Sequence, residues 1–212
     1  MKDLIINNVM SNIFKLDKYS DSKLIEIRYG LESLYLLITK LVVIIFLSLV
    51  FNIFEELMCF IVAFSLLKIS AFGLHAKKGW QCWLASIVIF TTIPFLIKLY
   101  VVNNIIMYRF MPLFIISFYL YAPADTEKKP IISNRKRSIY KVVTLLTSFI
   151  YISLIVIVKS SYLSSILFYS MLLESILINP LVYKLFGLNY NNYLSYIKKG
   201  EKIWNFMDCL LL

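Results

Sequence analysis

Six long apolar runs constrain the fold of this chain more than any other feature of its sequence. They lie at about 34–54, 57–74, 80–100, 105–121, 142–158 and 162–183, and each approaches the roughly 17 to 25 residues that a helix needs to cross the bilayer core. Hydrophobic residues make up 60% of the chain, which exceeds the roughly 45–50% of soluble domains. The sequence therefore predicts an all-α, polytopic integral membrane protein with about six transmembrane helices.

No polar, Gly/Ser-rich or Pro-rich block of domain size separates these runs, so we expect residues 1–212 to form a single integral membrane domain. Residues 34–183 would form the six-span bundle. Amphipathic helices are expected at the membrane interface on both sides of it, in segment 1–33 and in the tail 184–212. The apolar residues at helical spacing in the first segment are Leu4, Ile5, Val9, Ile13 and Leu16.

The formal net charge of +10 at pH 7 does not indicate nucleic-acid binding, because the basic residues lie between the apolar runs. They predict membrane topology instead, since cytoplasmic loops carry an excess of Lys and Arg. The loop after the fourth run is strongly basic, which places that loop, both termini and the turn at 77–78 in the cytoplasm. Its cations are Lys128, Lys129, Arg135, Lys136, Arg137 and Lys141.

The only histidine of the chain, His75, ends the second run, and Cys82 begins the third. In an unbroken helix these two residues would lie about 10.5 Å apart along the axis. Gly73 and Gly79 bracket the intervening segment and favour a hairpin, in which His75 folds back toward Cys82. The start of the third helix, together with Lys77 and Lys78, would then favour the Cys82 thiolate.

A histidine beside a thiolate is an activated nucleophile, and this pair predicts cysteine-based catalysis at the cytoplasmic face. Each residue also has a structural interpretation. A cysteine in a membrane span is often a small packing residue, and an interfacial histidine is often a solvated polar tip. Three cysteines without metal-like spacing argue against a disulfide framework, a metal site or a metal cofactor.

The segment "KISAFGLHAKKGWQC" (68–82) resembles the active-site segment of the accessory gene regulator protein B family, the membrane cysteine endopeptidases of Gram-positive quorum sensing. Two more segments resemble that family in the same order, "IRYGLE" (27–32) and "YAPADTEKKPI" (121–131). The resemblance implies a bacterial cell-membrane protein in which His75 and Cys82 are the catalytic pair and Gly73 is required at the turn. Lys68 stands where the family has an arginine, which keeps the charge but loses the bidentate fork.

The resemblance also implies the substrate, a precursor peptide with an amphipathic leader and an acidic tail. The enzyme would remove the tail through an acyl-enzyme thioester and promote cyclisation to a thiolactone or lactone signal, without a cofactor. Homodimerisation is an expectation of the same kind. We further expect Glu32 to be a candidate for orienting His75.

Two alternatives stay open at this stage. The basic loop with Lys128 and Lys129 fits attraction to the acidic tail, and it equally fits attraction to anionic lipid. Glu174 could pair with Arg109 inside the bundle or face the peptide path. The competing function is a transporter or exporter of a small peptide without proteolytic activity, which would not require the Cys82 thiol.

Overall fold

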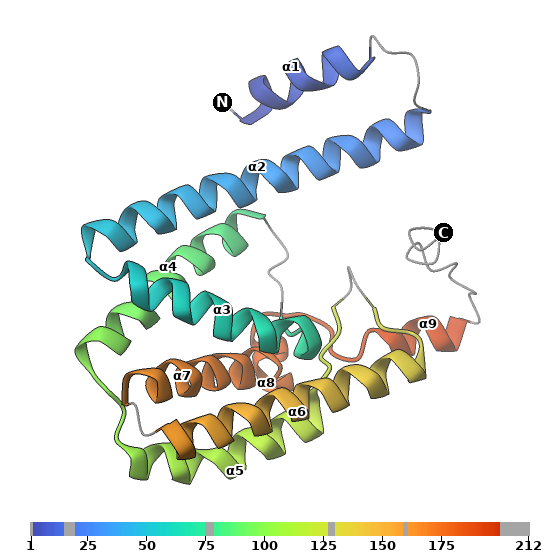
Figure 1. Ribbon diagram of the computed structural model, residues 1–212. Helices are drawn as coiled ribbons and strands as arrows, with labels where there is room; N and C mark the ends of the chain where they lie inside the picture. Colours follow the sequence, from blue (N-terminus) through green and yellow to red (C-terminus); the bar gives the residue numbers. More distant parts are fainter. Residues whose placement is uncertain (1, 15–19, 75–78, 127–129, 159–160, 200–212) are drawn as a thin grey trace. The chain divides into compact units, whose positions relative to one another are not determined.

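The computed structural model describes residues 2–14, 20–74, 79–126, 130–158 and 161–199, and these residues form helices joined by short connections (Figure 1). No β-strand occurs within these ranges, so the predicted all-α class is confirmed. The helices are α1 (Lys2–Phe14), α2 (Asp21–Val50), α3 (Phe54–Ala71), α4 (Gly79–Leu99), α5 (Asn104–Tyr121), α6 (Asn134–Val158), α7 (Ser161–Leu177), α8 (Pro180–Leu185) and α9 (Tyr193–Lys199).

Four of these helices, α2, α4, α5 and α6, are long and apolar enough to cross a membrane. Helix α7 is apolar but has only 17 residues, and α3 carries Glu55, Glu56 and Lys68 within its 18 residues. Large apolar side chains on these helices face outward, such as Leu113 on α5 and Ile157 on α6. Surfaces of this kind fit lipid rather than water.

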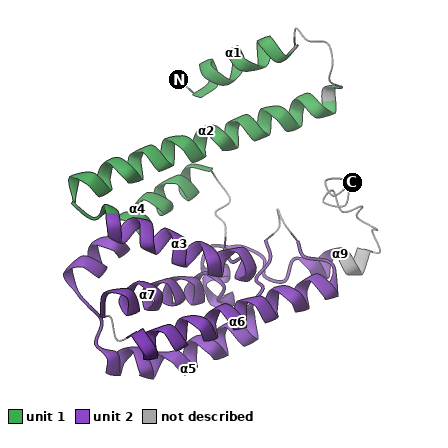
Figure 2. Ribbon diagram, viewed as in Figure 1, with its two compact units in different colours: residues 1–54, 77–92 green, residues 55–76, 93–212 purple. Residues whose placement is uncertain are grey.

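Two compact units divide the chain (Figure 2): unit 1 contains residues 1–54 and 77–92, and unit 2 contains residues 55–76 and 93–212. The division falls inside α4, next to Pro94, which cannot donate a helical hydrogen bond.

In unit 1, α1 packs on the first part of α2. Ile6 and Met10 of α1 are buried against Leu24, with Ile13 partly buried beside them. Leu4, Ile5 and Val9, which we predicted to face the membrane interface, are exposed, and their place at the interface stays a prediction. The second part of the predicted interfacial segment 1–33 is not separate from the first span, since α2 runs without a break from Asp21 to Val50.

The core of unit 2 is built by α5, α6 and α7. Phe110 and Phe114 of α5 meet Phe168 of α7 edge-on, with ring centroids 6.0 and 5.4 Å from the Phe168 centroid. Such edge-to-face pairs stabilise beyond their buried area.

Buried hydrogen bonds join α3 to α6 in the same unit. Thr144 donates to the hydroxyl of Ser70 (3.0 Å), and the Tyr151 hydroxyl donates to the carbonyl of Ala63 (2.7 Å). Polar groups inside a membrane domain need such partners, because lipid offers none. These bonds set how the end of α3 lies against α6.

The sixth predicted span, at 162–183, is wrong in its length. Helix α7 ends at Leu177, and α8 begins at Pro180 after Asn179, whose side chain accepts the N–H of Leu181 (2.9 Å). An asparagine cap followed by proline at the first helical position is a strong helix start. Hydropathy alone passes over this break because both sides of it are apolar.

Candidate functional site

The chain turns out of the helical conformation directly after α3, at Phe72 and Gly73. Both residues have a left-handed backbone, with φ of 64° and 88°. A positive φ is strained for phenylalanine and costs glycine little. The turn ends at Leu74, the last described residue before His75.

Main-chain hydrogen bonds hold this turn on two sides. Ala124 donates its N–H to the carbonyl of Ala71, and Gly73 donates to the carbonyl of Ala124, both at 2.9 Å. On the other side, Leu74 donates to the carbonyl of Leu177 at the end of α7, also at 2.9 Å. The first two bonds form an isolated parallel bridge between Phe72 and Ala124. The segments "AFGL" and "YAPAD", about fifty residues apart in sequence, are therefore in direct contact.

A buried ion pair lies beside the turn. The Lys68 ammonium is 3.5 Å from Oε2 of Glu174, whose side chain is 0% exposed, whereas that of Lys68 is 22% exposed. The partner of Glu174 is thus Lys68 of α3. The alternative that paired Glu174 with Arg109 does not hold, since Arg109 is exposed on α5. The pair links the last turn of α3 to α7.

Gly73 lies directly against this pair, so a side chain there would have to displace the Lys68 ammonium. A Cβ at position 73 would lie 2.8 Å from Nζ of Lys68, 3.2 Å from the carbonyl oxygen of Leu177 and 3.3 Å from Oε1 of Glu174. The positive φ and the close contacts both require glycine. The local geometry of the turn therefore depends on one residue type at this position.

Asp125 anchors the segment that supports the turn. Its buried carboxylate accepts the backbone N–H groups of Asn192 (3.0 Å), Tyr193 (2.9 Å) and Ile131 (3.4 Å). The Arg137 guanidinium lies 3.8 Å from the same carboxylate. Hydrogen bonds to an ionised group are stronger than neutral ones, so Asp125 ties the loop after α5 to the start of α6 and to the segment before α9.

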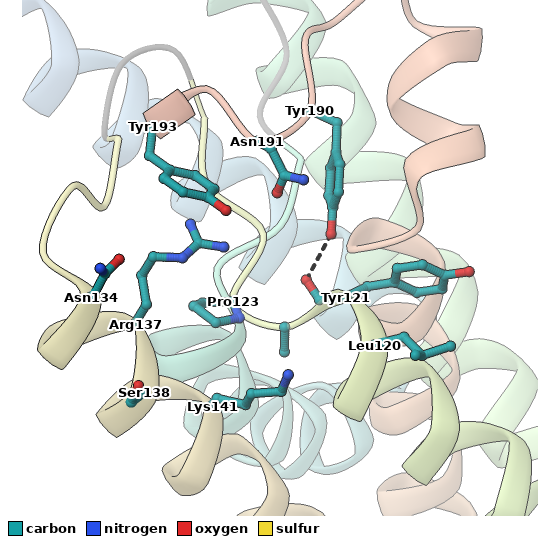
Figure 3. A pocket seen from close by; sticks show the side chains of 11 residues that line it. Leu120, Tyr121, Pro123, Asn134, Arg137, Ser138, Lys141, Tyr190, Asn191 and Tyr193 are labelled. Carbon is teal, nitrogen blue, oxygen red and sulfur yellow. Dashed lines mark hydrogen bonds between the residues drawn. The ribbon is translucent and has the colours of Figure 1, made fainter. Parts of the chain in front are cut away.

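Two tyrosines of the C-terminal segment support the same loop. The Tyr183 hydroxyl is shared between the carbonyls of Ala124 and Asp125, both at 3.3 Å. The Tyr190 hydroxyl donates to the carbonyl of Tyr121 at 3.0 Å (Figure 3). Burial raises the pKa of Tyr190 to about 12, so its hydroxyl remains a donor at neutral pH.

A pocket of about 500 Å³ opens between the end of α5, the start of α6 and the segment before α9 (Figure 3). Its basic groups are Arg137 and Lys141. Its other described lining residues have uncharged side chains: Leu120, Tyr121, Ala122, Pro123, Asn134, Ser138, Tyr190, Asn191 and Tyr193.

Cys82 lies in unit 1, in the first turn of α4, which begins at Gly79 as the glycine predicts. The side chain is partly buried and the cysteine is free. Gly79 is also closely packed, because a Cβ there would lie 3.0 Å from Cδ1 of Leu36.

Glu32, the candidate for orienting His75, is engaged elsewhere in unit 1. Its carboxylate pairs with Lys2 at 3.3 Å and with Arg28, one helical turn earlier, at 3.5 Å. The contact with Lys2 joins α1 to α2, whereas the contact with Arg28 lies within α2. The predicted role of Glu32 toward His75 stays a prediction.

Several predicted site residues lie outside the described part of the chain: His75, Lys77, Lys78, Lys128 and Lys129. The described residues contain no group of three His, Cys, Asp or Glu side chains that could hold a metal ion.

Asp125, Tyr183 and Tyr190 were not among the site residues predicted from the sequence. Asp125 is the one carboxylate of "YAPAD". An acidic residue just after a span and a proline is a signal that could have identified it as a candidate anchor of the loop. The two tyrosines stand in a tyrosine-rich tail, where nothing distinguishes a buried hydroxyl from an interfacial ring.

The helices and their outward apolar side chains define this chain as an α-helical membrane protein. Comparison with known proteins gives its family: the accessory gene regulator B model matches residues 3–178. The chain belongs to the accessory gene regulator B family, which takes part in quorum sensing.

Its relatives cover most of its length. An AgrB-like protein of Clostridium acetobutylicum is 28% identical over 84% of this chain and 86% of the relative. An AgrB-like protein of Listeria welshimeri is 28% identical over 85% of this chain and 89% of the relative. The accessory gene regulator protein B of Staphylococcus epidermidis is 26% identical over 80% and 86%, respectively. No solved structure matches the chain.

Proposed function

We propose that the protein is a membrane cysteine endopeptidase that cleaves a quorum-sensing precursor peptide and promotes its cyclisation. The observation that carries the proposal is the turn that ends at Leu74. Hydrogen bonds to Ala124 and Leu177 fix this turn directly before His75. A catalytic residue must be placed accurately, and a fixed turn next to it supports such a role.

Cys82 supplies the nucleophile in this proposal. It lies in the first turn of α4, where the positive end of the helix dipole stabilises a negative charge. His75 would take the thiol proton as general base, and the thiolate would attack the peptide carbonyl that joins the signal segment to the tail. The C–N bond breaks, and the amine of the tail leaves with the proton from His75.

The product of this step is a thioester between Cys82 and the peptide. A cysteine or serine within the peptide then attacks the thioester carbonyl, which closes the ring and returns the thiol of Cys82. Holding the two groups together gives an effective molarity on the order of 10⁵ M, so cyclisation can exceed hydrolysis.

The basic residues on the loop after α5 would place the active site and both termini on the cytoplasmic side. There, Lys77, Lys78, Lys128 and Lys129 would attract the acidic tail of the peptide. A homodimer is part of the same proposal.

The test is reconstitution of the purified protein in liposomes with the precursor peptide encoded beside its gene, followed by mass spectrometry of the products. Wild type should release the tail and form a cyclic product, and Cys82→Ala and His75→Ala should do neither. Cys59→Ala is the matched control, because Cys59 is an exposed cysteine on α3, and it should retain activity.

A peptide thioester trapped on Cys82 would support the intermediate directly. If Cys82→Ala still processed the peptide, cysteine catalysis would be excluded. Peptide movement across the liposome membrane without cleavage would favour the transporter instead.

A further inference from the structure

The pocket at the ends of α5 and α6 holds two cations that the proposed peptidase chemistry does not use. Arg137 and Lys141 face it from successive turns of α6 (Figure 3). None of the described residues that line it carries a carboxylate. The charge of this surface therefore favours an anionic ligand.

Arg137 is held in place and still has donor capacity. Its guanidinium carbon lies 3.6 Å from the centre of the Tyr193 ring, and the ring and Asp125 fix its position. Within the described part of the chain, its buried Nη1 lies 3.8 Å from the Asp125 carboxylate, beyond hydrogen-bond distance, and makes no hydrogen bond. Asp125 already accepts backbone N–H groups, so an anion in the pocket would give this donor a partner.

Lys141 lies one helical turn after Arg137 on α6 and is also oriented by an aromatic ring. Its Nζ is 4.6 Å from the centre of the Tyr119 ring on α5. Tyr119 precedes the end of α5 at Tyr121 by two residues. The ammonium is therefore level with the last turn of a candidate membrane span, where tyrosines and lysines mark the headgroup region.

The surface beside the pocket is apolar and faces outward. Tyr119, Leu120 and Val142 are 59%, 57% and 55% exposed, and they belong to α5 and α6, two of the candidate spans. A ligand with an anionic head and apolar chains would satisfy the cations and cover these side chains at once. A soluble acidic peptide would satisfy only the cations.

We propose that the pocket formed by Arg137, Lys141, Tyr190 and Tyr193 binds the phosphate headgroup of an anionic phospholipid, whose acyl chains lie along α5 and α6. The volume of about 500 Å³ is in the range of small-molecule sites. Basic pockets between membrane helices bind anionic headgroups in this way. The pocket contains neither His75 nor Cys82, so this inference and the peptidase proposal can fail independently.

Native mass spectrometry of the full-length protein in detergent tests the proposal, with phosphatidylglycerol and phosphatidylcholine of the same chains as probes. Wild type should bind phosphatidylglycerol more tightly than phosphatidylcholine. Arg137→Gln and Lys141→Gln should each weaken that binding about fivefold, as expected for one basic charge at an anionic surface. Lys141→Arg should retain it.

Arg135→Gln is the matched control, because Arg135 carries the same charge on the same helix but is exposed and does not line the pocket. It should bind phosphatidylglycerol as wild type does. An equal loss in Arg135→Gln, or equal affinity for the two lipids in wild type, would overturn the proposal. Circular dichroism of each variant establishes that a loss of binding is not a loss of fold.

Two further probes distinguish other anions. Glycerol phosphate should bind much more weakly than phosphatidylglycerol, and equal affinity would mean a site for soluble phosphate. Hexaglutamate should not displace the lipid. Binding of hexaglutamate that depends on Arg137 and Lys141, with lipid binding unchanged in the variants, would overturn the proposal in favour of a peptide site.

Discussion

The ion pair between Lys68 and Glu174 gives the sharpest prediction for stability. The two groups are 3.5 Å apart, and the glutamate is fully buried. Removing one partner of such a pair leaves an uncompensated charge and costs about 3–5 kcal/mol. Lys68→Met should fall near the upper end of that range because the carboxylate left behind has no exposure, and Glu174→Met near the lower end because Lys68 is 22% exposed.

The double variant Lys68→Met/Glu174→Met separates the pair from the packing around it. Replacement of a whole buried pair by apolar side chains of similar size is often neutral. The double variant should therefore be far more stable than the sum of the two single effects, with a coupling energy of at least about 2 kcal/mol. Lys68→Arg keeps the charge and should remain close to wild type.

The assay is unfolding in mixed detergent micelles with increasing dodecyl sulfate, followed by loss of helical circular dichroism. A cost of 3 kcal/mol is a change of more than about a hundredfold in the equilibrium constant, which such a titration detects. A Lys68→Met variant as stable as wild type would refute the ion-pair argument. Additive effects in the double variant would refute it equally.

Three smaller perturbations test the surroundings of the turn. Gly73→Ala should destabilise the protein by more than about 1 kcal/mol, because alanine is strained at this positive φ and meets Lys68, and peptide processing should fall with it; full activity would contradict a fixed turn. Asp125→Asn should cost about 1.5–3 kcal/mol in the same titration, since it removes charged hydrogen bonds to backbone N–H groups, and no loss would mean that these bonds are not stabilising. Tyr151→Phe should cost only about 0.6 kcal/mol for its bond to Ala63, and a loss above about 2 kcal/mol would point to repacking of α3 against α6.

Hydropathy predicted a helix closely where a clear signal in the sequence marks the start of the apolar run. The runs at 80–100 and 105–121 correspond closely to α4 (Gly79–Leu99) and α5 (Asn104–Tyr121), because Gly79 and the cap Asn103 mark their starts. The run at 142–158 underestimates α6, which begins at Asn134. A hydropathy pattern excludes the polar first two turns of that helix although their backbone is helical.

The sequence could not predict the partner of Glu174, because a partner depends on which helices pack together. Arg109 and Lys68 are both cations on apolar helices, and only the contact of α3 with α7 places Lys68 beside the carboxylate. The role of Asp125 was hidden for a similar reason. Two of its three backbone N–H partners, Asn192 and Tyr193, are more than sixty residues away, and any residue but proline supplies such a group.

The turn before His75 is joined to its supports through peptide groups of Ala71, Gly73, Leu74, Ala124 and Leu177. Four of these five positions can exchange their side chains without removing a donor or an acceptor, as long as proline does not take an N–H away. Sequence drift at Leu74 or Leu177, which are only partly buried, therefore keeps the bonds of the joint. Ala124 is fully buried and must stay small, and Gly73 is fixed by its backbone and its surroundings. Such a joint lets a lineage alter the surface around the turn while the backbone of the turn stays the same.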